Sequence, residues 1–103
     1  MKQTAMISQP MKDISSDDIL ATREKAINTL EQFGYDVVGS YFADDGFVSD
    51  DTKNIPVAYL AKSIAIMAKC NAVYFCRGWE TARGCKIEHE IANSYGLAVI
   101  YEE

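Results

Sequence analysis

The sequence predicts a compact α/β fold with a four-stranded parallel sheet. Apolar segments of strand length alternate with segments whose apolar residues recur at helical spacing, and this alternation is typical of parallel strands joined by helical crossovers. The segment Ala72–Phe75 is apolar throughout, as expected of a parallel strand that helices cover on both faces. With 103 residues, the chain has room for one domain, which we place at residues 1–103.

The first expected elements are a short strand at Thr4–Ile7, the loop Ser8–Met11 and a long helix. The cluster Ser15-Ser16-Asp17-Asp18 predicts the helix start, because hydroxyls cap free N–H groups and acids favour the positive end of the helix dipole. Apolar residues then recur at helical spacing as far as Phe33. Gly34 is expected to close the helix in the left-handed conformation.

A second short strand is expected at Tyr35–Val38. The segment 43–54 is polar and acidic, which predicts an exposed, mobile loop. Pro56 suits the first turn of a second helix, which we expect to run to about Lys69.

The third strand, Ala72–Phe75, is followed by an expected helix over Lys86–Ser94, which ends at Gly96, and by a last strand over Leu97–Tyr101. Right-handed crossovers between these parallel strands give the order 2-1-3-4. The sequence therefore predicts a compact flavodoxin-like or Rossmann-like three-layer sandwich with one switch point, between its first and third strands.

Composition and charge exclude several classes of function. The formal net charge of −5 disfavours nucleic acid or an anionic membrane as the main partner, since both need basic surfaces. No apolar run is long enough to span a membrane, and the start of the chain does not resemble a signal peptide. The chain has one histidine and an odd number of cysteines without a CxxC pair: Cys70, Cys76 and Cys85. We therefore expect a cytoplasmic protein with reduced thiols, no metal and no cofactor.

Two loops are expected to lie side by side at the switch point, Ser8–Met11 and Arg77–Gly84. Ligands of open α/β sheets bind at such a point. Gly78 and Gly84 would let the backbone approach a ligand closely. The start of the following helix offers free N–H groups and a partial positive charge. These features predict a site for a small molecule with a ribose or a phosphate.

Several side chains of these loops allow two interpretations. Trp79 either stacks on a base or covers the edge of the core. Arg77 and Arg83 either hold a phosphate or pair on the surface with Glu80 or Glu102.

In the first loop, Ser8 either donates to a phosphate or ribose or serves turn formation. The same loop adds three further candidate ligand contacts: Gln9, Pro10 and Met11. His89 is expected to be solvated or to lie at an interface. Tyr41 and Phe42 are expected to shield a pocket or to pack against a second subunit.

Four pieces of the chain resemble the small nucleoside 2-deoxyribosyltransferase-like domains common in phages and bacteria. They are Ile7-Ser8-Gln9-Pro10-Met11, Cys70-Asn71-Ala72-Val73-Tyr74-Phe75, Gly78-Trp79-Glu80-Thr81-Ala82-Arg83-Gly84 and Glu88-His89-Glu90. The resemblance covers nearly the whole chain. It implies the same fold, a nucleoside or nucleotide pocket, and a homo-oligomer, since relatives build their pockets at subunit interfaces.

The resemblance also implies a role for Glu88. In the transferases and related nucleotide N-glycosidases, a Gly-x-x-x-Glu segment supplies the carboxylate that attacks the anomeric carbon of deoxyribose, and here it falls on Gly84 and Glu88. We expect Glu88 in the first turn of its helix, kept ionised by the helix dipole and nearby arginines, as a nucleophile requires. Alternatively, Glu88 accepts hydrogen bonds from ribose hydroxyls or is a solvated helix residue.

Two departures from the family pattern favour binding without turnover. The enzymes place an aspartate on the helix before the third strand, where it handles the proton of the leaving base. Here that place holds Ser63, and a serine cannot act as a general acid near neutral pH. The strand also usually opens with an aspartate, where this chain has Asn71.

The sequence therefore predicts a protein that binds a nucleotide or a nucleotide-derived small molecule. The family resemblance implies one use, which is to sequester a nucleotide immune signal, such as a cyclic ADP-ribose derivative, as a phage anti-defence sponge. The alternative is a nucleoside 2-deoxyribosyltransferase or a 2′-deoxynucleotide N-glycosidase that uses Glu88 as its nucleophile. A third possibility is a structural or partner-binding module.

Overall fold

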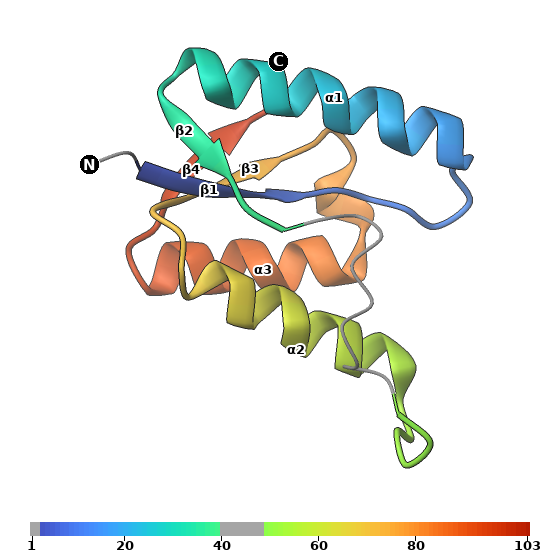
Figure 1. The fold of residues 1–103 in the computed structure, drawn as a ribbon. Coiled ribbons are helices and arrows are strands. Elements are labelled where there is room, and N and C mark those ends of the chain that lie inside the picture. Colours follow the sequence, from blue (N-terminus) through green and yellow to red (C-terminus); the bar gives the residue numbers. More distant parts are fainter. Residues whose placement is uncertain (1–2, 40–48) are drawn as a thin grey trace.

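The computed structural model describes residues 3–39 and 49–103. These residues form the predicted α/β fold, a parallel four-stranded sheet in the order β2-β1-β3-β4. The strands are β1 (Gln3–Ser8), β2 (Tyr35–Val37), β3 (Ala72–Phe75) and β4 (Ala98–Tyr101). The helices are α1 (Ser16–Gln32), α2 (Ile55–Met67) and α3 (Arg83–Ser94), with the short 3₁₀ helix η1 (Trp79–Thr81) before α3. Figure 1 shows α1 on one face of the sheet and α2 and α3 on the other.

The predicted helix ends are confirmed where a local signal marks them. The Ser15 hydroxyl accepts a hydrogen bond of 3.2 Å from the backbone N–H of Asp18 and so caps α1. Gly34 follows that helix with a φ of 90°, in the left-handed region that glycine adopts without strain. At the start of α2, the side chain of Asn54 accepts from the backbone N–H of Val57, and Pro56 occupies the first turn.

One helix begins earlier than the sequence predicts. α3 starts at Arg83 rather than Lys86. The backbone N–H of Lys86 already donates to the carbonyl of Ala82, at 2.9 Å, so the turn that contains Gly84 is helical. The sequence predicted a loop at this glycine, although a glycine in a helix costs only about 1 kcal/mol relative to alanine.

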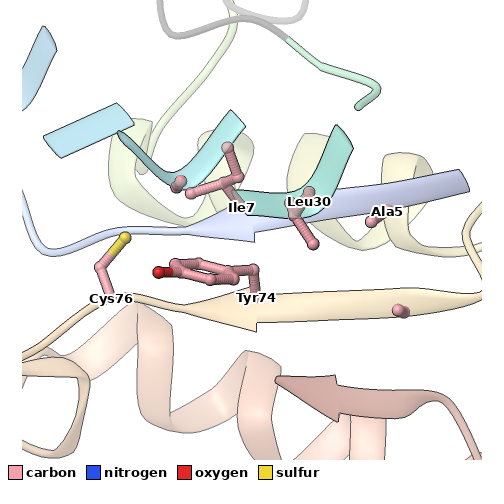
Figure 2. Close-up of a cluster of buried hydrophobic side chains, with 7 residues drawn as sticks. Ala5, Ile7, Leu30, Tyr74 and Cys76 are labelled. Carbon is pink, nitrogen blue, oxygen red and sulfur yellow. The ribbon is translucent and has the colours of Figure 1, made fainter. Parts of the chain in front are cut away.

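The core lies in two layers, one on each face of the sheet, because successive strand residues point to opposite faces. The layer under α1 contains these buried residues: Ala5, Ile7, Ala26, Leu30, Ala72, Tyr74 and Cys76. Figure 2 shows the side chains of Tyr74 and Cys76 on the side of β3 that faces α1. The layer under α2 and α3 contains Met6, Met67, Cys70, Val73, Phe75 and Ala92.

The segment 40–48, with Tyr41 and Phe42, lies outside the described residues, so the expectations for those two aromatic residues and for the first part of the acidic loop are not tested. Asp50, Asp51, Lys53 and Asn54, which belong to the rest of that loop, are exposed, as predicted. Among the described residues, no helix is both long and apolar enough to span a membrane.

A substitution at Leu30 tests how α1 packs on the core layer beneath it. The side chain has no exposed surface, so we expect Leu30→Ala to lower the free energy of unfolding by about 2–5 kcal/mol through lost burial and the cavity left behind. Leu20→Ala is the matched control, because Leu20 lies on the same helix with 40% of its surface exposed; we expect it to cost less than about 1 kcal/mol. Urea unfolding followed by circular dichroism measures both. Equal losses would contradict this packing of α1.

Candidate functional site

The two loops singled out in the sequence lie side by side where β1 and β3 end, as the strand order predicts. Ser8 is paired with Phe75 in the sheet, and the backbone N–H of Cys76 donates to the Ser8 carbonyl at 3.0 Å. Beyond the strands, a Cβ placed on Gly78 would lie 3.6 Å from Cγ of Pro10. The ends of both loops therefore meet at the switch point.

A buried polar cluster lies beneath these loops, on the side of α2 and α3. The Ser8 hydroxyl donates to Oε1 of Glu88 at 2.6 Å, and the two side chains are only 1% and 7% exposed. The hydroxyl of Ser63 on α2 is hydrogen-bonded to the same carboxyl group. The thiol of Cys85 is hydrogen-bonded to Ser8. We call these four residues the Glu88 cluster; it joins β1, α2 and α3.

Burial raises the pKa of Glu88 above its ordinary value of 4.5, and the hydrogen bonds from Ser8 and Ser63 only partly oppose this shift. Burial therefore opposes the ionisation of Glu88 that we expected from the helix dipole and nearby arginines. Because α3 begins at Arg83, Glu88 lies in the second turn of the helix, where the dipole has little effect. Arg77 and Arg83 are exposed, whereas Glu88 is buried.

Trp79 belongs to a group of aromatic rings that covers the edge of the core. Its indole stacks on the ring of His89, with 3.9 Å between centroids and 23° between planes. Nε2 of His89 lies 2.7 Å from the hydroxyl of Tyr101, and the ring of Phe75 meets His89 edge-on at 4.9 Å. Of the two interpretations of Trp79, this geometry matches the covering role.

The position of His89 was not predicted from the sequence. It was expected to be solvated or at an interface, but it is half-buried and bridges η1, α3 and β4 through the contacts above. No local pattern predicts this, because its partners Trp79 and Tyr101 come from other elements.

The start of α3 is open, by which we mean that no side chain caps it and that free space surrounds its first turn. Ala82, which precedes the helix, provides no side-chain hydrogen bond to cap it, and the first turn carries no acidic residue. A Cβ placed on Gly84 would meet no atom within 4 Å, so packing does not require a glycine there. The exposed side chain of Arg83 belongs to the same turn. This combination leaves room for an anion at the helix start.

The remaining candidates lie on the side of α1. A hollow of about 150 Å³ is lined by Gln9, Pro10, Ile14, Thr22, Cys76, Arg77 and Glu102. The backbone N–H of Arg77 donates to Oε1 of Glu102 at 2.8 Å, and Nζ of Lys25 lies 3.7 Å from Oε2 of the same carboxylate. Met11 is 42% exposed. The candidate contacts thus divide between the two faces of the sheet, with Ser8 on one and Gln9 on the other.

The chain belongs to the family described as a domain of unknown function (DUF4406), which matches residues 6–101. No curated protein and no solved structure matches the chain. In the described part of the chain, no group of three or more His, Cys, Asp or Glu side chains is placed to hold a metal ion. Because the family description states no activity, the resemblance to nucleoside deoxyribosyltransferase-like domains stays a prediction.

The raised pKa of Glu88 predicts a pH-dependent stability. Between the ordinary value of 4.5 and the higher value in the fold, the folded state binds more protons than the unfolded state. Stability is therefore lost as pH rises through this window. The glutamine of Glu88→Gln cannot titrate, so this variant serves as the reference. We expect the difference in the free energy of unfolding, wild type minus variant, to decrease from pH 4.5 to neutral pH.

Urea unfolding at a series of pH values measures this difference. Glu90→Gln is the control for the loss of one carboxyl group from the exposed side of the same helix. A wild-type advantage over Glu88→Gln that grows toward neutral pH would mean that the pKa of Glu88 is lowered, contrary to the effect of its burial.

Proposed function

We propose that this chain binds a nucleotide or a nucleotide-derived small molecule at the carboxyl edge of its sheet, without turnover. The observation that carries the proposal is the buried carboxyl group of Glu88, hydrogen-bonded by Ser8 and Ser63 next to the β1–β3 switch point. Ligands of open α/β sheets bind at this position. Carboxyl oxygens accept hydrogen bonds from hydroxyl groups, so a sugar hydroxyl can take the place of a serine hydroxyl on Glu88.

The open start of α3 supports the phosphate part of the proposal. An uncapped helix start presents backbone N–H groups and a partial positive charge, which favour a phosphate. Arg83 adds a guanidinium that matches phosphate oxygens, and the open space at Gly84 lets the ligand approach the backbone. In the proposed complex, the phosphate lies at the start of α3 and the sugar lies toward Glu88.

Two features of the Glu88 cluster favour binding over catalysis. A nucleophilic carboxylate must be ionised, and burial, which raises the pKa of Glu88, works against that ionisation. Cleavage of an N-glycosidic bond also needs a proton donor for the leaving base, and the side chain that α2 brings to the carboxyl group is the hydroxyl of Ser63. The transferase or N-glycosidase activity therefore stays the alternative.

The biological side of the proposal rests on the resemblance to phage and bacterial nucleoside 2-deoxyribosyltransferase-like domains. A binder without turnover would sequester its ligand, such as a cyclic ADP-ribose derivative used as an immune signal against phage. We place the protein in the cytoplasm, where its three cysteines, which are free and buried, would remain reduced. We also propose a homo-oligomer, as the resemblance to nucleoside 2-deoxyribosyltransferase-like domains implies.

Calorimetry with a panel of ribo- and deoxyribonucleoside 5′-monophosphates tests the phosphate contact. We expect the best nucleotide to bind more tightly than its nucleoside, and Arg83→Ala to weaken nucleotide binding by about 1–3 kcal/mol, the worth of a charged hydrogen bond. Lys69→Ala is the matched control, because it removes one positive charge from an exposed site at the opposite end of the sheet. Equal affinity for nucleoside and nucleotide, unchanged in Arg83→Ala, would remove the phosphate from the proposal.

Chromatography of the same mixtures separates a binder from an enzyme. We expect the wild type to release no free base over hours, and Glu88→Ala to lose nucleotide affinity because the acceptor for the sugar hydroxyl is gone. Glu90→Ala, an exposed change on the same helix, should bind like the wild type. Steady base release that disappears in Glu88→Ala would establish the N-glycosidase alternative in place of the binder.

A further inference from the structure

We propose that the open edge of β4 is the surface through which two copies of this chain pair, strand against strand in antiparallel orientation, so that their sheets join into one. This inference rests on the homo-oligomer part of the proposed function and not on the nucleotide site. It adds which segment forms the contact between the copies, and in what register.

β2 and β4 are the two edges of the described sheet, and they differ in how they are protected against pairing. Natural proteins protect an edge by keeping the strand short or by placing charges or proline on it. β2 has three residues, and the central one is Asp36. β4 has four residues, Ala98–Tyr101, and none of them is charged or a proline. Of the two edges, β4 is therefore the one without such protection.

The backbone of β4 directs hydrogen-bonding groups away from the sheet at regular positions. The N–H groups of Ala98 and Glu102 donate to carbonyls at the two ends of β3, at 3.0 and 2.9 Å, so these two residues face β3. Because the hydrogen-bonding groups of successive strand residues point to opposite sides, those of Val99 and Tyr101 point away from β3. No described strand lies on that side of β4.

These outward groups are complementary to a second copy of the same strand. In an antiparallel ladder, two opposite residues of a hydrogen-bonded pair exchange both N–H···O bonds. A register centred on Ile100 places Val99 opposite Tyr101 of the second copy, and Tyr101 opposite its Val99. The twofold axis of this register makes the contact closed, so a dimer forms rather than a fibre.

The side chains suit the same register. On the α3 side, each Val99 lies opposite a Tyr101, and such pairs of an aromatic and a β-branched residue stabilise neighbouring strands. Tyr101 is 49% exposed in the single chain, so it has surface left to bury. On the other side, α1 packs chiefly on β1 and β2, which leaves Ala98 exposed and Ile100 half-buried. There Ile100 meets its own copy.

The charges near β4 permit this pairing, although each chain has a net charge of −5. Glu102 lies opposite Ala98 of the second copy, and Glu103 lies opposite its Leu97, so no carboxylate directly opposes another. Within each chain, Nζ of Lys25 lies 3.7 Å from Oε2 of Glu102 and offsets part of its charge. The register therefore avoids the like-charge pairs that destabilise neighbouring strands.

Sedimentation and hydrogen exchange of the full chain, without any ligand, test the interface. At ~0.1 mM chain, about a hundredfold above a micromolar dissociation constant, we expect analytical ultracentrifugation to show a dimer. NMR should then show slow exchange of the Val99 and Tyr101 amide protons. In a monomeric variant these two protons should exchange freely, whereas those of Ala98 and Glu102 stay protected by β3.

Two substitutions of the exposed Ala98 test the register through the sign of a charge. Ala98→Glu places a carboxylate opposite Glu102 of the second copy, whereas Ala98→Lys places an ammonium group there. Because opposite charges stabilise cross-strand pairs and like charges destabilise them, we expect Ala98→Glu to dimerise about tenfold more weakly than Ala98→Lys. Gln32→Glu and Gln32→Lys change the net charge equally at the exposed end of α1, and these controls should dimerise alike.

Val99→Pro tests the backbone hydrogen bonds. Proline lacks the N–H group, and at this position that group points to the open edge, where a sheet tolerates proline. We expect Val99→Pro to be a monomer, and the Ala98 variants decide the matter if it does not fold. An oligomer whose Val99 and Tyr101 amides exchange freely, or equal dimerisation of Ala98→Glu and Ala98→Lys, would overturn this interface but not the homo-oligomer. A monomeric wild type would overturn both, and no outcome bears on nucleotide binding.

Discussion

The hydrogen bond between Ser8 and Glu88 is the constraint on which the geometry of the candidate site depends. It links the last residue of a central strand to the second turn of α3, between side chains that are almost completely buried. Removal of either partner would leave the other buried group with one hydrogen bond fewer, which typically costs about 1–3 kcal/mol. The bond therefore fixes α3 against the end of β1, and with it the position of the open helix start and of Trp79.

The fold could be predicted from the sequence because its signals are local. Ser15 and Gly34 mark the two ends of α1 by cap chemistry that needs no tertiary contact. The apolar segment Ala72–Phe75 predicts its own burial on both faces, and all four of its residues are buried. Once three helices separate four strands, the handedness of the crossovers restricts the strand order to few choices, and 2-1-3-4 is the order observed.

The chemistry of the site could be predicted only in part, because it depends on tertiary contacts. The sequence identified Ser8 and Glu88 as candidates, yet their mutual hydrogen bond joins residues far apart in the chain. The ionisation of Glu88 was inferred from its place in a helix, whereas burial beneath the loops decides its pKa. Ser63 was identified through the family resemblance alone, and its contact with Glu88 arises from the packing of α2 against α3.

Successive side chains at the end of β1 point to opposite faces of the sheet. The carboxyl edge of the sheet therefore has one environment on the side of α1 and another on the side of α2 and α3. Ser8 turns toward α2 and α3, where hydroxyl groups meet a carboxyl group, whereas its neighbour Gln9 turns toward α1 and borders the hollow. This division continues the two-residue alternation of β1 into Gln9, the first residue after the strand. A change on one face therefore need not disturb the other.

Gly78 lies between the two environments. Its φ of 88° favours glycine, and a Cβ there would lie 3.6 Å from Cγ of Pro10. On the one side, Pro10 lines the hollow. On the other, Gly78 precedes η1, which leads into α3 and sets where that helix begins. The contact with Pro10 would be an ordinary one, so it is the backbone conformation at this turn, and not lack of space, that favours glycine between the two environments.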